Sequence, residues 1–199
     1  MSAAFTLEEV LAATGGELIA LGGRVRFPGV TTDTRAIAAG ELFVAVRGDT
    51  HDGHAFVGDA LAHGAGAVLV ERGRLEAPVA GGVIAVRDTL AALGDLAAWH
   101  RRRRRPRVVA ITGSNGKTTT KELLVGICST ALGTHAVLRT RGTQNNLVGL
   151  PLTLLRLGDE DVAIVEAGMN GPGDDPPNDR RIPLKPAMFD YQALASAGK

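Results

Sequence analysis

The sequence has too little cysteine, too little excess charge and too short hydrophobic runs for several classes of protein. Its single cysteine, Cys128, excludes a disulfide within the chain. The 22 basic and 21 acidic side chains leave a net charge of +1, which argues against bulk nucleic acid or an acidic membrane surface as the main partner. No uncharged apolar run reaches the roughly 18 residues of a membrane span, and the acidic N-terminus lacks the basic region of a signal peptide. We expect a soluble, cytoplasmic monomer.

The composition is that of a folded protein, with 45% hydrophobic and 22% charged residues among 199. At roughly 150 residues per domain, the length allows one or two domains. The 26 glycines exceed the usual share, which is about 7%, and predict many tight turns or close backbone approaches.

Residues 1–87 are expected to form a small α/β domain. A capping box at Thr6 and Glu9 predicts a helix that runs to about Thr14. Turn residues then separate short strands at 17–21, 25–27, 29–32, 42–46, 67–70 and 83–86, with a helix over 55–63. Asp88 is the expected N-cap of a further helix to about Trp99.

Residues 88–106 are interpreted as that helix and a linker. The simplest interpretation of the five arginines 101–105 before Pro106 is a solvated helix end. Positive charges are favourable there because they interact with the negative C-terminal end of the helix dipole. A direct role on a phosphate or nucleic acid is the alternative.

The pattern changes after Pro106. Strands are expected at 107–112, 135–138 and 161–166, and helices at 121–130 and 146–157, with a polar loop over 113–120. This βαβαβ order predicts half of a doubly wound parallel sheet, whose first strand is expected to be buried. Residues 107–170 are therefore interpreted as a partial parallel α/β domain. Residues 171–199 hold five of the nine prolines and are expected to be irregular or disordered.

The loop TGSNGKTTT at 112–120 carries the strongest chemical signal. It follows a strand and opens a helix, as a phosphate-binding loop must. Lys117 would reach the β- and γ-phosphates of ATP, and the Thr118 hydroxyl would ligate Mg²⁺. The expected ATP-binding residues are Gly113, Ser114, Asn115, Gly116, Lys117, Thr118 and Thr119. An ordinary glycine-rich turn is the alternative. Ile111 stands where the common form of this loop has its first glycine. The loop is therefore a variant that belongs to a narrower set of ATP-using proteins.

Six segments together resemble one family. TGSNGKTTTKE at 112–122 is similar to the ATP loop of the Mur ligases and their folylpolyglutamate synthase and cyanophycin synthetase relatives. Three segments resemble the N-terminal UDP-substrate domain of that family: TDTR at 32–35, GELFVA at 40–45 and GDTHDGHAF at 48–56. Two further segments resemble the central domain of the family: NNLVGLPLTLL at 145–155 and VEAGMN at 165–170. The resemblance covers residues 1–170.

The resemblance implies an α/β fold with a small substrate domain and an incomplete P-loop-type parallel ATP-binding domain. It further implies an ATP- and Mg²⁺-dependent ligase that joins D-Ala-D-Ala to UDP-N-acetylmuramoyl tripeptide through an acyl phosphate. Lys117 and Glu166 would then be catalytic, and Thr118 and Glu166 would ligate the metal. The implied substrate-binding residues are Thr32, Asp33, Thr34, Arg35, Arg47, Gly48, Asp52, His54, Asn145 and Asn146.

Several alternatives stay open at this point. Turn and cap chemistry could account for the Asn pair and for the loops in the N-terminal part, and Glu166 could be an exposed acid at a strand end. His51, Asp52 and His54 could form a metal cluster by count. The chain could instead be a sibling ligase of this family or a non-catalytic UDP-sugar-binding module.

The resemblance is expected to end at about Asn170. A chain truncated there would have little or no ligase activity, and its sheet would keep a bare edge and an uncovered apolar face.

Overall fold

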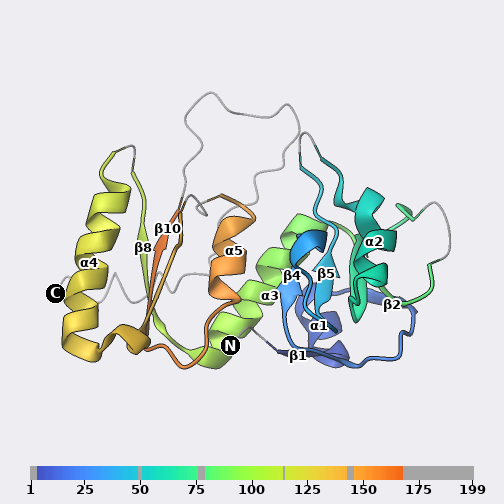
Figure 1. Cartoon of the computed structure of the whole chain (residues 1–199), viewed down its shortest axis with the longest axis horizontal. Helices are drawn as coiled ribbons and strands as arrows, with labels where there is room; N and C mark the ends of the chain where they lie inside the picture. Colours follow the sequence, from blue (N-terminus) through green and yellow to red (C-terminus); the bar gives the residue numbers. More distant parts are fainter. Residues whose placement is uncertain (1–3, 49–50, 76–78, 114, 143–145, 168–199) are drawn as a thin grey trace. The chain divides into compact units, whose positions relative to one another are not determined.

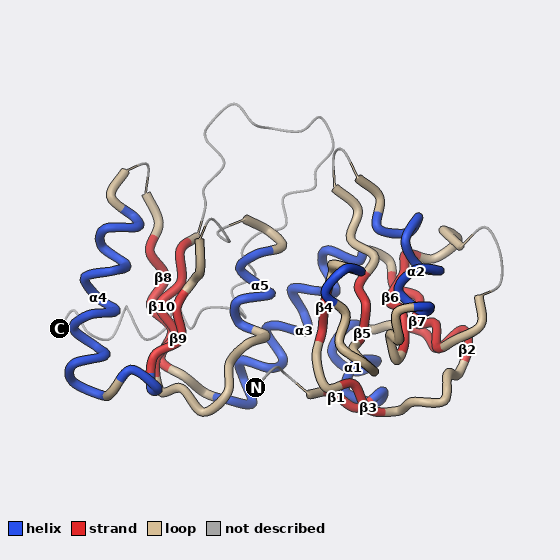
Figure 2. The backbone as a smooth tube through the Cα atoms, viewed as in Figure 1, coloured by secondary structure: helices blue, strands red, loops and turns tan. Residues whose placement is uncertain are grey.

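The computed structural model describes residues 4–48, 51–75, 79–113, 115–142 and 146–167. The chain divides into two compact units, one ending at Trp99 and the other beginning at His100. Both units are α/β, with parallel strand pairs in each (Figures 1 and 2). No helix among the described residues is long and apolar enough to cross a membrane.

The first unit is built on a five-stranded sheet. Its elements are β1 (Phe5–Thr6), α1 (Leu7–Thr14), β2 (Glu17–Ala20), β3 (Arg26–Phe27), β4 (Val30–Thr31), η1 (Thr34–Ala36), β5 (Leu42–Val44), η2 (Gly53–Phe56), α2 (Val57–Ala62), β6 (Ala67–Glu71) and β7 (Gly82–Val86). The strand order is β2-β7-β6-β5-β4, with β2 antiparallel to β7 and the other pairs parallel. The capping box is confirmed: the Thr6 hydroxyl accepts from the Glu9 N–H, and the Glu9 carboxylate from the Thr6 N–H.

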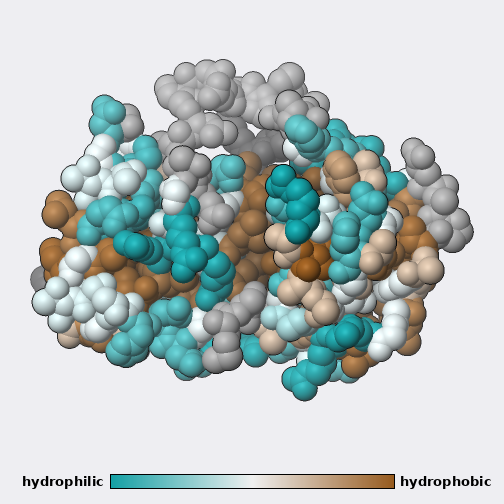
Figure 3. Space-filling model, viewed as in Figure 1, coloured by the Kyte–Doolittle hydropathy of each residue, from teal (hydrophilic) through white to brown (hydrophobic). Residues whose placement is uncertain are grey.

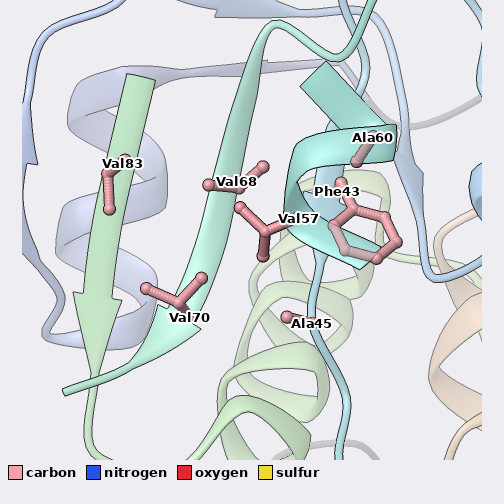
Figure 4. Packing of buried hydrophobic residues seen from close by; sticks show 7 residues of the cluster. All are labelled: Phe43, Ala45, Val57, Ala60, Val68, Val70 and Val83. Carbon is pink, nitrogen blue, oxygen red and sulfur yellow. The ribbon is translucent and has the colours of Figure 1, made fainter. Parts of the chain in front are cut away.

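The core of this unit lies between the sheet and α2. Val57 and Ala60 of α2 pack on side chains of β5 and β6, including Phe43 and Val68 (Figure 4). Successive residues of β6 and β7 are nearly all buried, because helices cover both faces of these central strands. The carboxyl ends of β5 and β6 lie at one edge of the sheet, since these strands pair in parallel.

The helix after β7 is longer than the sequence predicts. α3 spans Thr89–Arg104 and continues through most of the arginine run. Arginine is a good helix former, and positive charges are favourable at the C-terminal end of a helix, so the run extends the helix. The helix stops at Arg105, which adopts a left-handed φ of 54° before Pro106. Asp88 does cap the start, accepting from the Ala91 N–H.

The second unit contains a three-stranded parallel sheet. Its elements after α3 are β8 (Arg107–Ile111), α4 (Lys117–Leu132), η3 (Thr134–Ala136), β9 (Val137–Arg139), α5 (Gly149–Leu154) and β10 (Val162–Glu166). The order β8-β10-β9 places the last strand between the other two (Figure 2). The carboxyl ends of β8 and β10 thus lie side by side, with Glu166 paired to Ile111.

The expectation that the first strand is buried is wrong. β10 is fully buried, whereas β8 is half-buried or exposed along its length. The physical reason is position, because β8 is an edge of the described sheet and β10 its centre. α4 likewise exposes three large apolar side chains, Leu123 and Ile127 at 64% each and Leu132 at 46%. Figure 3 shows hydrophobic surface in the region of α4.

Helix boundaries also differ from the sequence prediction. α4 begins at Lys117, not at Lys121, because the polar residues before Leu123 already take helical geometry. The helix expected over 55–63 is a 3₁₀ turn followed by α2, and the helix expected over 146–157 is the shorter α5.

Candidate functional site

The glycine-rich turn between β8 and α4 contains two glycines with positive φ next to the start of a helix. Gly113 and Gly116 have φ values of 140° and 76°, which favour glycine. Gly116 is the N-cap of α4, so the N–H groups of the first helical turn lie at this end of the helix. Lys117 curls back over the turn and donates from Nζ to the Gly113 carbonyl.

Thr118 and Glu166 meet at the carboxyl end of the sheet. The Thr118 hydroxyl, in the first turn of α4, lies 3.4 Å from Glu166 Oε2 at the end of β10. Glu166 is buried, so the alternative of an exposed strand-end acid is wrong. A hydroxyl and a carboxylate are hard oxygen donors, the type that Mg²⁺ prefers. The donor pair therefore fits a magnesium ion that would also bind phosphate oxygens.

A buried lysine completes this cluster and was not singled out from the sequence. Lys121 Nζ lies 3.0 Å from Glu166 Oε1 and 3.1 Å from Glu122 Oε1. Burial alone would lower the pKa of Lys121, but the contacts with Glu166 and Glu122 outweigh it and raise that pKa. Its spacing of three residues from Thr118 on a helix was the available signal, since residues so spaced share one face.

The first unit brings two further loops to one edge of its sheet. β4 and β5 are parallel neighbours, so the segments after them, 32–35 and 46–54, both leave from the carboxyl edge. This edge is where ligands bind in open α/β sheets. The sequence-predicted residues Thr32, Asp33, Thr34, Arg35, Arg47, Gly48, Asp52 and His54 all lie in or beside these segments.

Asp33 and Arg35 form a local ion pair in the first of these loops. Arg35 donates from Nε and Nη2 to the two Asp33 carboxylate oxygens at 2.9 and 2.7 Å, and its backbone N–H also donates to Asp33. The side-chain and backbone bonds from Arg35 lower the pKa of Asp33 to about 2. The Arg35 side chain is 88% exposed, so its guanidinium is accessible from solvent.

His54 is fixed inside the second loop. Its Nε2 accepts from the Glu71 N–H at 2.9 Å, so the ring proton is on Nδ1, which lies 2.6 Å from Asp52 Oδ1. The His54 side chain is 6% exposed. Gly53 is required beside it, since a Cβ there would lie 2.8 Å from the Val46 backbone. Asp52 and His54 therefore hold this loop onto the end of β6.

The remaining predicted residues give a mixed result. Asn146 Oδ1 accepts from the N–H groups of Val148 and Gly149, at 3.2 and 2.7 Å, which is the turn-and-cap chemistry left open by the sequence. Ser114 and Asn145 lie outside the described residues. Within the described part of the chain, no group of three or more His, Cys, Asp or Glu side chains could hold a metal, so the cluster of His51, Asp52 and His54 does not form.

These features define a class of protein: a parallel α/β domain with a phosphate-binding turn, preceded by a second α/β unit with loops at its sheet edge. Comparison with known families narrows it. Residues 26–101 match the Mur ligase family, catalytic domain, and residues 111–189 match the Mur ligase middle domain. The second match runs beyond Asn170, so the expectation that the resemblance ends there is wrong. The chain belongs to the Mur ligase family.

Individual relatives agree with this assignment. The chain is 44% identical over 171 residues to the UDP-N-acetylmuramoyl-tripeptide–D-alanyl-D-alanine ligase of Escherichia coli, covering 85% of this chain and 36% of that protein. It is 41% identical over 147 residues to the Bacillus subtilis ligase of the same name, covering 73% and 32%. The chain thus spans about a third of the length of these relatives.

Solved structures share the fold. A crystal structure of MurF from Acinetobacter baumannii superposes with a TM-score of 0.76 at 34% identity, covering 86% of this chain and 37% of that one. The MurF ligase of Thermotoga maritima, solved in complex with ADP, gives 0.64 at 33% identity, covering 73% and 33%.

Proposed function

We propose that this chain forms part of an ATP-dependent ligase that joins D-Ala-D-Ala to UDP-N-acetylmuramoyl tripeptide, in the cytoplasm, where ATP is supplied. The observation that carries the proposal is the meeting of Lys117, Thr118 and Glu166 at a glycine-rich turn. It is supported by the relatives' names, since the chain is 44% identical to one such ligase over 171 residues.

The proposed reaction has two steps. The γ-phosphoryl group of ATP moves to an oxygen of the tripeptide's terminal carboxylate, which releases ADP and leaves an acyl phosphate. The amine of D-Ala-D-Ala then attacks the acyl carbon, so that an amide bond forms and phosphate leaves. Such phosphoryl transfer depends on positioning and on stabilising negative charge.

The second unit would hold the nucleotide. Backbone N–H groups of the turn over 113–119 would face the phosphates, and Lys117 would exchange the Gly113 carbonyl for phosphate oxygens. Thr118 and Glu166 would hold Mg²⁺, which when bound would neutralise charge on the phosphate oxygens. The pairing of Lys117 with a carbonyl oxygen supports this role, since the ammonium is already folded over the turn.

The first unit would hold the UDP part of the precursor. The hydroxyls of Thr32 and Thr34 and the accessible guanidinium of Arg35 would donate to uridine and diphosphate oxygens. Arg47 and Gly48 would form the neighbouring wall. Asp52 and His54, occupied with each other and with the Glu71 N–H, would support this loop from beneath.

Calorimetric titration of the full chain with two ligands tests the proposal. ADP with Mg²⁺ and UDP-N-acetylmuramoyl tripeptide should each bind, and saturation with one should leave a site for the other. Binding of the UDP-tripeptide without binding of ADP would favour a UDP-sugar-binding module instead. Absence of both binding events would overturn the proposal.

A further inference from the structure

We propose that Lys121 is a positioning residue, which holds the Glu166 carboxylate in place for the divalent cation of the nucleotide site. The inference rests on the proposed function and adds a residue to it. Lys121 belongs to α4, on the helix face that also presents Thr118, and Glu166 ends β10.

Three oxygen atoms surround the Lys121 ammonium. Besides the two carboxylates, Glu166 and Glu122, the Thr140 carbonyl lies 3.4 Å from Nζ. Its side chain is only 3% exposed, so water does not take the place of these partners. A buried ammonium enclosed by three oxygen atoms is held in place, unlike one on a solvent-exposed stem.

The two oxygens of the Glu166 carboxylate have different neighbours as a result. Oε1 lies 3.0 Å from Lys121 Nζ, and Oε2 lies 3.4 Å from the Thr118 hydroxyl. The backbone of Glu166 is held as well, because its N–H donates to Thr140 Oγ1 at 3.0 Å. Thr140 therefore contacts both members of the ion pair, through its hydroxyl and its carbonyl.

These different neighbours of the two carboxylate oxygens suit a metal site. One oxygen is anchored, and the other is left beside the second hard donor. Without Lys121, a carboxylate whose side chain is 4% exposed would lose its cationic partner and would turn or shift to find another. Groups that orient metal ligands from outside the coordination sphere typically change metal affinity by about 10- to 100-fold.

The test measures how much Mg²⁺ strengthens ADP binding to the full chain. The ratio of the Kd for ADP without Mg²⁺ to the Kd with Mg²⁺ is determined by calorimetry, which needs no catalytic turnover. Lys121→Met should lower this ratio about tenfold. Arg139→Met is the matched control, because it removes a cation from Glu122, 3.0 Å away, without touching Glu166, and it should leave the ratio within twofold.

A double-mutant cycle separates positioning from a general charge effect. In a Glu166→Gln background, the further change Lys121→Met should not lower the ratio any more, since Lys121 then has no carboxylate to place. The double variant also avoids an uncompensated buried charge. If Lys121→Met alone does not fold, Lys121→Gln gives the same comparison, with the same loss expected, since its side chain is shorter and neutral.

The outcomes are distinct. A wild-type chain in which Mg²⁺ does not strengthen ADP binding would overturn the proposed function, and this inference with it. A wild-type chain with a clear Mg²⁺ effect that Lys121→Met leaves within twofold would overturn the role of Lys121 alone. A further loss from Lys121→Met in the Glu166→Gln background would also overturn it.

Discussion

Replacing His54 with alanine tests whether this residue of the N-terminal loop supports the fold or contacts the substrate directly. The ring nitrogens are both engaged, Nε2 by the Glu71 N–H and Nδ1 by Asp52. Truncation would leave the backbone N–H of Glu71 without its acceptor, at a cost of about 1–3 kcal/mol. The lost bond to the partly exposed Asp52 and the lost packing of a ring that is 6% exposed add about 1 kcal/mol.

We therefore expect His54→Ala to lower the free energy of unfolding by roughly 2–4 kcal/mol. Urea unfolding followed by circular dichroism and by the fluorescence of Trp99, the only tryptophan, measures this change. His63→Ala is the matched control: His63 is exposed in the same unit, and its loss should change the free energy by less than about 0.5 kcal/mol.

The opposite result would refute the reasoning. If His54→Ala unfolds within about 0.5 kcal/mol of the wild type but loses affinity for UDP-N-acetylmuramoyl tripeptide, His54 contacts substrate and is not a support of the loop. The two roles make opposite predictions for the two measurements, so no third assay is needed.

Three further predictions concern local geometry and pH. Gly53→Ala should lower the urea midpoint clearly, because its Cβ would lie 2.8 Å from the Val46 backbone, whereas Gly58→Ala, with open space around it, should lower it little or raise it. Thr6→Ala should cost about 1 kcal/mol by removing the helix cap, and an unchanged midpoint would contradict the capping box. Burial lowers the pKa of His100 below 6.5, so the unfolded chain binds the proton more tightly, and stability should fall as pH drops below 6.5; a His100→Gln variant should lose this pH dependence.

The sequence predicts the elements of this fold better than their burial. Periodicity and turn residues placed most strands of both units to within two residues. The same apolar pattern cannot say which strand is central, because that depends on pairing between distant segments. β8 and β10 have similar apolar runs, yet only β10 lies between two neighbours and is buried.

Prediction of the candidate nucleotide site from the sequence has the same limit, because some of its contacts join distant segments. The turn over 112–120 carries its chemistry in consecutive residues, so it could be located from the sequence alone. Lys121 gains its significance only from Glu166 and Thr140, which the fold brings to it from two other segments. The sequence marks His54 as a candidate substrate-binding residue, but the residue whose N–H it accepts from, Glu71, follows 17 positions later and has no local signature.

Binding of ADP with Mg²⁺ to the wild-type chain and to Lys117→Met tests the nucleotide site most directly. Lys117 sits over the turn through its bond to the Gly113 carbonyl, and in the proposed site it binds phosphate instead. The wild type should bind ADP, and Lys117→Met should bind it at least about tenfold more weakly, since a charge-assisted contact is worth about 1.5–3 kcal/mol. Its affinity for UDP-N-acetylmuramoyl tripeptide should stay unchanged. A wild-type chain that does not bind ADP, or a Lys117→Met variant that binds it equally well, would contradict the account.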